Sequence, residues 1–129
     1  MVHRGPNGAG TYMGANGVLG HRRLSIVDLE RGDQPITDES GKRAIVANGE
    51  IYNFESLRRW LSKTHRFKTR SDTEAALHLY DALGKDAAGR LDGMFAVAIT
   101  DGPELFLVRD PMGIKPLYYA QRDGMLLFA

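Results

Sequence analysis

The sequence predicts an α+β fold with antiparallel sheets, and three observations support this prediction. Strand-like segments come before and after two amphipathic helical segments, and the later strands are joined by short turns. Short turns join antiparallel neighbours, because a parallel crossover needs a dozen or more residues. The chain has 129 residues, of which 43% are hydrophobic, and this suits one domain with a buried core.

The N-terminal part of the chain is expected to combine a loop with a strand. Residues 1–16 contain four glycines, one proline and two asparagines, a composition typical of a loop. Residues 18–27 suit a strand, with Leu24 and Ile26 on one face and Arg23 on the other. Arg23 thus lies among apolar residues of a strand-like segment.

A second strand is expected after a further loop. Residues 32–41 are predicted to be a loop, because Pro35 interrupts regular structure. Ala44 to Ala47 form a short apolar segment typical of a strand, and Asn48-Gly49-Glu50 is expected to end it. Polar groups therefore follow directly after a buried segment.

A first helix is predicted to begin after Asn53, whose side chain suits the N-cap position. The spacing of its apolar residues gives one stripe for burial. The residues of this stripe are Phe54, Leu57, Trp60 and Leu61.

A second helix is predicted to open at Ser71-Asp72-Thr73-Glu74, which has the S-x-x-E form of a capping box. Gly84 suits the C′ position at its end, and residues 87–91 suit one or two further helical turns. Its apolar stripe consists of Leu77, Tyr80 and Leu83.

The last third of the chain has the alternation of strands. Phe95, Val97 and Ile99 alternate with small residues, which predicts a strand packed on both faces. The turn Asp101-Gly102-Pro103 leads into residues 104–108 and so predicts a hairpin. A second hairpin is predicted from residues 117–120 and 125–129 around Asp123-Gly124.

Composition excludes several classes of function. With 17 basic and 16 acidic residues, the net charge of +1 gives no global attraction to nucleic acid or acidic membranes. The apolar runs are shorter than the roughly 20 residues of a membrane span, and without a leader-like segment we expect a cytoplasmic protein. The absence of cysteine excludes disulfides and thiolate metal sites, and the four histidines lack metal-ligand spacing, so no metal is expected.

Residues 58–70 contain six lysines and arginines with Trp60 and Phe67 between them. Such a segment could attract nucleic acid. Helix periodicity accounts for the aromatic residues, and we therefore favour a solvated basic face.

A set of polar residues at strand and helix ends has the groups that a free α-amino acid requires. The guanidinium of Arg23 can hold an α-carboxylate through two hydrogen bonds, and Glu50 and Asp72 can neutralise an α-ammonium. The Asn48 side chain and the Gly49 N–H can donate to a developing oxyanion. Each residue also has an ordinary structural explanation: a surface ion pair, a turn or a favourable charge at a helix end.

Seven blocks of the sequence resemble, in order, the glutaminase domain of asparagine synthetase. This domain is a class II glutamine amidotransferase of the N-terminal-nucleophile hydrolase type, and the resemblance extends over residues 1–129 as a partial type-2 domain. The blocks are HRGPNG (3–8), GHRRLSIVDL (20–29), QP (34–35), NGEIYNF (48–54), SDTE (71–74), RLDGMFAVAITD (90–101) and RDPMGIKPLYY (109–119).

The resemblance implies a four-layer αββα sandwich of two antiparallel sheets. It also implies that a mature N-terminal cysteine attacks the glutamine amide, that ammonia leaves, and that the glutamyl thioester is then hydrolysed. Its site residues match positions of this chain as follows: Arg23 and the backbone of Ile26 and Val27 bind the carboxylate, Asn48 and Gly49 form the oxyanion hole, and Glu50 and Asp72 hold the ammonium.

The sequence departs from the family pattern at its N-terminus. Family chains carry the nucleophilic cysteine and one strand before the HRGP block, and here His3 already lies in that block. Because losing a nucleophile removes about 10⁶ in rate where this has been tested, we expect no measurable glutaminase activity from this chain alone. Without the strand, we expect low stability or filling of the gap by another chain.

The expected partners follow from the resemblance. L-glutamine is the expected substrate, and the ammonia would pass to an adenylated carboxylate in a C-terminal ATP-dependent synthetase domain, to which ATP and Mg²⁺ belong. Association into a homodimer is a further option. The alternatives are a non-catalytic scaffold for assembly and a nucleic-acid binder acting through residues 58–70.

Overall fold

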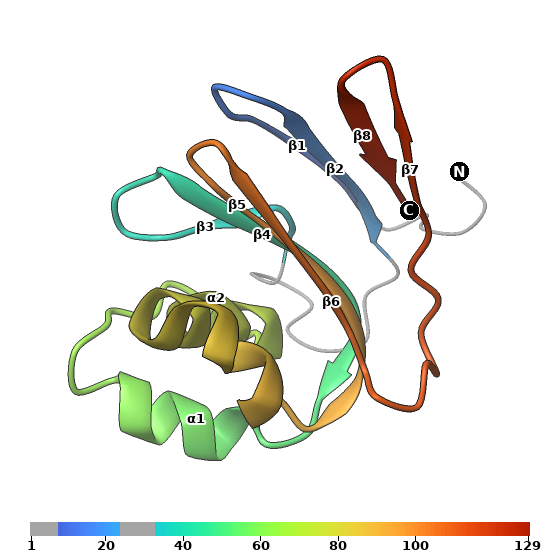
Figure 1. Ribbon diagram of the computed structural model, residues 1–129. Helices are drawn as coiled ribbons and strands as arrows, with labels where there is room; N and C mark the ends of the chain where they lie inside the picture. Colours follow the sequence, from blue (N-terminus) through green and yellow to red (C-terminus); the bar gives the residue numbers. More distant parts are fainter. Residues whose placement is uncertain (1–7, 24–32) are drawn as a thin grey trace.

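A computed structural model describes residues 8–23 and 33–129 (Figure 1). Four antiparallel strands form the central sheet in the order β3-β4-β5-β6, and two further pairs form separate ribbons, β1-β2 and β7-β8. The strands are β1 (Gly8–Met13), β2 (Val18–Arg23), β3 (Ile36–Thr37), β4 (Arg43–Ile51), β5 (Gly93–Asp101), β6 (Glu104–Arg109), β7 (Tyr119–Arg122) and β8 (Met125–Phe128). The helices are α1 (Phe54–Leu61), α2 (Asp72–Leu83) and the 3₁₀ helix η2 (Gly84–Arg90).

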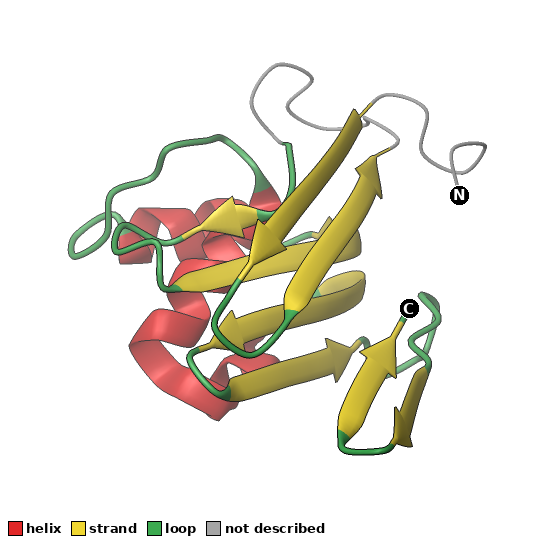
Figure 2. Cartoon of the chain, turned by 90° about the horizontal axis from the view of Figure 1, so that it is seen from above, coloured by secondary structure: helices red, strands yellow, loops and turns green. Residues whose placement is uncertain are grey.

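The elements stack in layers, with the helices on one side of the central sheet and the ribbons on the other (Figures 1 and 2). Phe95, Val97 and Ile99 of β5 face the helices and pack in one core. Ala98 faces the other way, in a second core with Leu19 of β2. The predicted burial of β5 on both faces is confirmed, as is the antiparallel α+β class.

The prediction of a loop for residues 1–16 is wrong at residues 8–13 and holds at residues 14–16. Residues 8–13 form β1, and each of them pairs with a residue of β2 in an unbroken antiparallel register. A Cβ at Gly10 would lie 2.1 Å from the backbone oxygen of Gln34, so only glycine allows this close approach. Composition indicated turns here, whereas the glycines serve strand packing.

The predicted end of β4 at residues 48–50 is also wrong. The strand runs to Ile51, and Asn48, Gly49 and Glu50 each pair with β5. Gly49 has a φ of +130°, a conformation that L-residues rarely adopt, so the glycine permits the strand to continue. Within the predicted loop 32–41, residues 36–37 also pair with β4 as the short strand β3.

The first helix is confirmed, but two details of its prediction are wrong. Asn53 lies at the N-cap position without capping α1, because its side chain bonds the backbone of Arg90 and Asp92 instead. Trp60 remains 48% exposed, since a residue six positions after Phe54 lies off the buried stripe.

The second helix begins and ends as predicted. The Ser71 hydroxyl accepts a bond from the Thr73 N–H at the N-cap, and Gly84 takes a φ of +58° at the C-cap. The capping box is only half formed, because the Glu74 carboxylate accepts bonds from the N–H groups of Lys68 and Thr69 rather than Ser71. The Glu74 carboxylate thus binds the backbone of the preceding loop, whereas in a complete capping box it would bind the backbone N–H of the N-cap residue.

Both C-terminal hairpins are confirmed. β5 and β6 pair around residues 102–103, and β7 and β8 pair around Asp123 and Gly124, which have φ values of +51° and +77°. Positive φ at both central residues is the mark of a type I′ hairpin turn. In the described part of the chain, no helix is both long and apolar enough to cross a membrane.

Candidate functional site

The predicted site residues Asn48, Gly49 and Glu50 follow one another at the end of β4. Asn48 and Gly49 are exposed and Glu50 is half-buried. A Cβ at Gly49 would lie 1.9 Å from the backbone oxygen of Met94 on the paired strand, which leaves no room for any other residue. The backbone at Gly49 is therefore fixed closely against β5 while the opposite side stays accessible.

Asp72 is brought to the same strand end by the start of α2. Its Oδ2 accepts a hydrogen bond of 2.8 Å from the N–H of Ile51, and its Oδ1 accepts one of 2.9 Å from the N–H of Thr73. A carboxylate at a helix N-terminus is also favoured by the helix dipole. The structure thus joins Asp72 directly to the residue that follows Glu50.

Within residues 8–23 and 33–129, the backbone of β4 beyond Ile45 has no neighbouring strand on the side away from β5. Along the strand, the backbone N–H and C=O groups of Ala47, Gly49 and Ile51 point away from β5. The two-residue strand β3 pairs with β4 only as far as Ile45 and does not reach these groups. Side chains bind this edge instead. Gln34 Oε1 accepts the Ala47 N–H at 2.6 Å, and Asp72 accepts that of Ile51.

The ribbon β1-β2 approaches the same edge. His21 Nε2 lies 3.1 Å from the Ala47 oxygen, and since a carbonyl only accepts, Nε2 carries the donated hydrogen. Arg23 ends β2, two residues beyond His21. The side chain of Arg23 lies outside the described part of the structure, as do Ile26 and Val27 together with the predicted face of Leu24, so their assignments stay predictions.

Asp110 holds the backbone opposite Gly49 from the far side of β5. Its buried carboxylate accepts hydrogen bonds from the N–H groups of Lys115 at 3.0 Å, Ile114 at 2.9 Å and Phe95 at 3.3 Å. The bond from Lys115, with the others, holds the pKa of Asp110 below its usual range despite burial. Phe95 pairs with Gly49, so this carboxylate supports the site's backbone.

Sequence reasoning missed the roles of Gln34, His21 and Asp110. Gln34 lies in a loop and Asp110 follows a strand, and nothing in their local sequence indicates which distant backbone groups they bind. The only available signal was that each lies in a block shared with the family that the chain resembles. Such long-range hydrogen bonds depend on how the layers stack. The pattern of residues along the chain does not predict this stacking.

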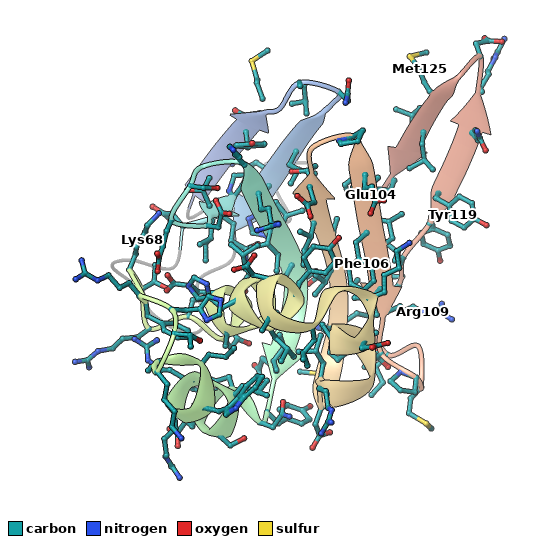
Figure 3. All side chains as sticks on the ribbon, turned by 60° about the vertical axis from the view of Figure 1, so that its left-hand side comes forward. Lys68, Glu104, Phe106, Arg109, Tyr119 and Met125 are labelled. Atoms are coloured by element: carbon teal, nitrogen blue, oxygen red, sulfur yellow. The ribbon has the colours of Figure 1, made fainter. Side chains whose placement is uncertain are left out.

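Two basic side chains of the segment 58–70 make contacts within the fold. Arg58 donates to the Thr69 oxygen at 2.7 Å and lies 4.3 Å from the centre of the Phe67 ring. Lys68, labelled in Figure 3, donates to the Asp38 oxygen at 2.8 Å. Arg59, Lys63, Arg66 and Arg70 are exposed, and the solvated basic face stays a prediction.

Among residues 8–23 and 33–129, no three side chains of the kinds that bind metals gather at one place. The polar groups at the candidate site are an amide, backbone N–H groups and two carboxylates. These groups can bind a small zwitterion and stabilise negative charge on its amide oxygen.

Comparison with known proteins identifies relatives along the whole chain. A family model described as a glutamine amidotransferase domain matches residues 1–129. A probable glutamine-hydrolysing asparagine synthetase of Dictyostelium discoideum is 44% identical over 134 residues, covering 100% of this chain and 24% of that protein. The glutamine-hydrolysing asparagine synthetase 1 of Bacillus subtilis is 44% identical over 132 residues, covering 100% of the chain and 21% of the relative. The chain thus spans about a quarter or less of these relatives.

Two solved structures have similar folds. The glutamine phosphoribosylpyrophosphate amidotransferase from Bacillus subtilis superimposes with a TM-score of 0.71 at 26% identity, covering 86% of this chain and 27% of that one. A structure described as the allosteric regulatory enzyme of purine biosynthesis gives a TM-score of 0.66 at 28% identity, covering 79% of this chain and 25% of that one. The fold of the chain is therefore that of the N-terminal-nucleophile amidotransferases.

Proposed function

The chain belongs to the family of glutamine amidotransferase domains, and we propose that it supplies the glutamine site of an asparagine synthetase-like enzyme. The observation that carries this proposal is the hydrogen bond between the Ile51 N–H and the Asp72 carboxylate. It holds a helix-end carboxylate beside the strand end formed by Asn48, Gly49 and Glu50. The α-ammonium of an amino acid and the polarity of its side-chain amide can be met there together.

The carboxylates of Glu50 and Asp72 bind the α-ammonium of glutamine in this proposal. Asp72 already accepts two backbone bonds, but an ionised carboxylate has about four acceptor positions, which leaves capacity for an ammonium. Arg23 binds the α-carboxylate, with the backbone of Ile26 and Val27. The position of Arg23 at the end of the strand that approaches Ala47 supports this assignment.

Asn48 and Gly49 act on the amide end of glutamine. The Asn48 amide and the Gly49 N–H donate to the oxygen that becomes negative when a nucleophile attacks the amide carbon. The exposure of both residues and the fixed backbone at Gly49 support this role, because donors that do not reorganise stabilise the transition state best. The closeness of β5 therefore serves chemistry as well as packing.

The chemistry itself requires a nucleophile, which the family resemblance assigns to an N-terminal cysteine. Its sulfur loses a proton and forms a bond to the amide carbon, the carbon–nitrogen bond breaks, and the nitrogen takes up that proton and leaves as ammonia. Water then hydrolyses the thioester to give glutamate and the free thiol. We propose that the ammonia reaches an adenylated carboxylate in a synthetase domain, and that ATP and Mg²⁺ act in that domain rather than at the residues described above.

The test uses a restored enzyme, defined as residues 1–129 joined to the Cys-bearing N-terminal segment that the resemblance implies. Release of ¹⁵N-ammonia from amide-labelled glutamine is measured by NMR. We expect ammonia from the restored enzyme and none when its cysteine is replaced by alanine. A folded restored enzyme that neither binds glutamine nor releases ammonia would contradict the proposal and favour the scaffold alternative.

A further inference from the structure

The peptide groups of Ala47 are bound by side chains from two other elements. The Gln34 amide oxygen accepts the Ala47 N–H at 2.6 Å, and His21 Nε2–H donates to the Ala47 oxygen at 3.1 Å. The donor at Ala47 can only be an N–H, so the orientation of the Gln34 amide is determined. The residue directly before Asn48 is therefore held on both of its polar groups.

This arrangement replaces a strand with side chains along one edge of β4. A further strand at this edge would bind the polar groups of Ala47, Gly49 and Ile51 in succession. Instead, Gln34 binds at Ala47 and Asp72 binds at Ile51, on either side of Gly49. Among the described residues, no strand pairs with Gly49 on this side.

Gln34 also connects the site's other parts. Its Nε2 donates to the Thr73 hydroxyl at 3.4 Å, next to Asp72 at the start of α2. Its backbone oxygen lies 2.1 Å from the position that a Cβ of Gly10 would occupy. The strand β1 therefore packs directly against Gln34. One residue thus contacts the strand that carries Asn48, the helix that carries Asp72, and the ribbon that ends at Arg23.

We infer that Gln34 is a positioning residue for the glutamine site. Its side-chain oxygen fixes the Ala47 peptide and so directs Asn48 and Gly49 toward the amide of the substrate. This inference rests on the proposed function for the identity of the ligand. The hydrogen bond to Ala47 and its effect on the strand end can be tested without any ligand.

The first measurement uses the unmodified chain, labelled with ¹⁵N and ¹³C. A scalar coupling across the hydrogen bond, between the Ala47 nitrogen and the side-chain carbonyl carbon of Gln34, is expected in the NMR spectrum. Its absence, with the Ala47 resonance assigned, overturns the inference. This measurement does not depend on the stability of any variant.

Three variants then separate the two hydrogen bonds of Gln34. Gln34→Met has similar length but no amide, Gln34→Glu keeps the acceptor for Ala47 and loses the donor, and Thr73→Val removes only the partner of that donor. We expect the Ala47 amide to exchange with solvent about tenfold faster in Gln34→Met. Gln34→Glu and Thr73→Val should keep the slow exchange of the unmodified chain.

The strand end is read from the amide resonances of Asn48 and Gly49. A positioning role predicts that these resonances move in Gln34→Met and return in Gln34→Glu, while amides in the middle of α2 stay unchanged. Unchanged Asn48 and Gly49 resonances in a folded Gln34→Met variant would overturn the inference. A purely structural role would instead move resonances throughout both layers.

Titration with L-glutamine links the residue to the site. We expect affinity to fall about three- to tenfold in Gln34→Met and to be recovered in Gln34→Glu. Equal affinities in all variants would contradict the role of Gln34 in the site. If the unmodified chain shows no response to glutamine, its substrate-site assignment fails, whereas the coupling and exchange data still decide whether Gln34 holds the strand end.

Discussion

The central sheet and the β7-β8 ribbon are similar in sequence pattern and different in packing. β5 and β8 are both rich in apolar residues, yet Phe95 of β5 is 2% exposed while Tyr119 and Leu127 of the ribbon are 72% and 65% exposed. β5 has strands on both edges and layers on both faces, whereas in the described part of the chain β7 pairs with β8 alone (Figures 1 and 3). Burial is therefore set by the surrounding layers rather than by the apolar character of a strand.

The candidate site draws on both kinds of region. Asn48, Gly49, Glu50 and Asp72 belong to the sheet and its helices, whereas Arg23 ends a two-stranded ribbon. The proposed function thus places the side-chain amide of the substrate against the central sheet and its α-carboxylate against the β1-β2 ribbon. We therefore expect effects on turnover from Asn48 and Gly49, and effects on binding from Arg23.

The largest effect is expected from the core of the central sheet. Phe95→Ala should lower the free energy of unfolding by about 3–5 kcal/mol, because it opens a cavity between β5 and the helices. Urea denaturation followed by circular dichroism measures the change. A loss below about 1 kcal/mol would show that this core is packed no better than the ribbon.

Next in size is the effect of removing the proposed oxyanion donor. Asn48→Ala in the restored enzyme should lower kcat by about 10²–10³ with little change in KM, since the donor acts on charge that develops only in the transition state. Steady-state ammonia release measures both constants. A change in KM alone would assign Asn48 to substrate binding.

The buried carboxylate of Glu74, in the first turn of α2, makes the stability of the protein depend on pH. Burial alone would raise the pKa of Glu74, but the nearby His78 ring, with Nε2 at 3.6 Å, and hydrogen bonds from Thr69 and the Lys68 N–H outweigh it and lower the pKa to about 2. Because the folded pKa lies below the unfolded value of 4.5, this stabilisation is present above pH 4.5 and is lost as pH falls toward 2. The contribution is on the order of 3 kcal/mol.

The acid dependence is checked by urea denaturation at several pH values. Glu74→Gln should be less stable at neutral pH and should lose less stability than the original chain between pH 5 and pH 2. Parallel pH profiles for the two proteins would show that other carboxylates, such as those of Asp38 and Asp110, dominate the acid response.

A smaller effect, on substrate binding, is expected from Arg23 at the end of β2. Arg23→Ala in the restored enzyme should weaken glutamine capture by about 1.5–3 kcal/mol, the usual range for a charge-assisted hydrogen bond. KM should rise while kcat changes little. An unchanged KM would remove Arg23 from the carboxylate site and with it the division of the substrate between the two regions.

The smallest effect is expected on the exposed face of β8. Leu127→Ala should change the free energy of unfolding by no more than about 0.5 kcal/mol, as at most surface positions. The same urea denaturation used for Phe95→Ala provides the comparison. A loss as large as that of Phe95→Ala would mean that this face of the ribbon is covered in solution.

Much of the fold could be predicted because its signals are local. The turn at Asp123-Gly124, the N-cap at Ser71 and the C-cap at Gly84 each depend on a few neighbouring residues, and all three are confirmed. The errors in the strand assignments occur where contacts with distant parts of the chain decide the structure. At residues 8–13, and again at residues 48–50, glycines that resemble loop residues allow close backbone approach within strands.

The candidate site was partly predictable for the same reason. Asn48, Gly49, Glu50 and Asp72 carry the chemistry of an amino-acid site in their side chains and backbone, and the hydrogen bond from Ile51 to Asp72 brings them together. Gln34 carries no such signal. Its importance comes from the backbone group that it meets, and that depends on the path of a loop across the sheet edge.

The close approach at Gly10 has a consequence for mutations far from the substrate. A single methyl group there would act as a wedge between the ribbon and the loop at Gln34, because no space remains for it. The resulting displacement would move His21 from Ala47 and shift the ribbon end that carries Arg23. A residue with no reactive group of its own thus sets the spacing between β2 and the end of β4, the two ends of the proposed binding site.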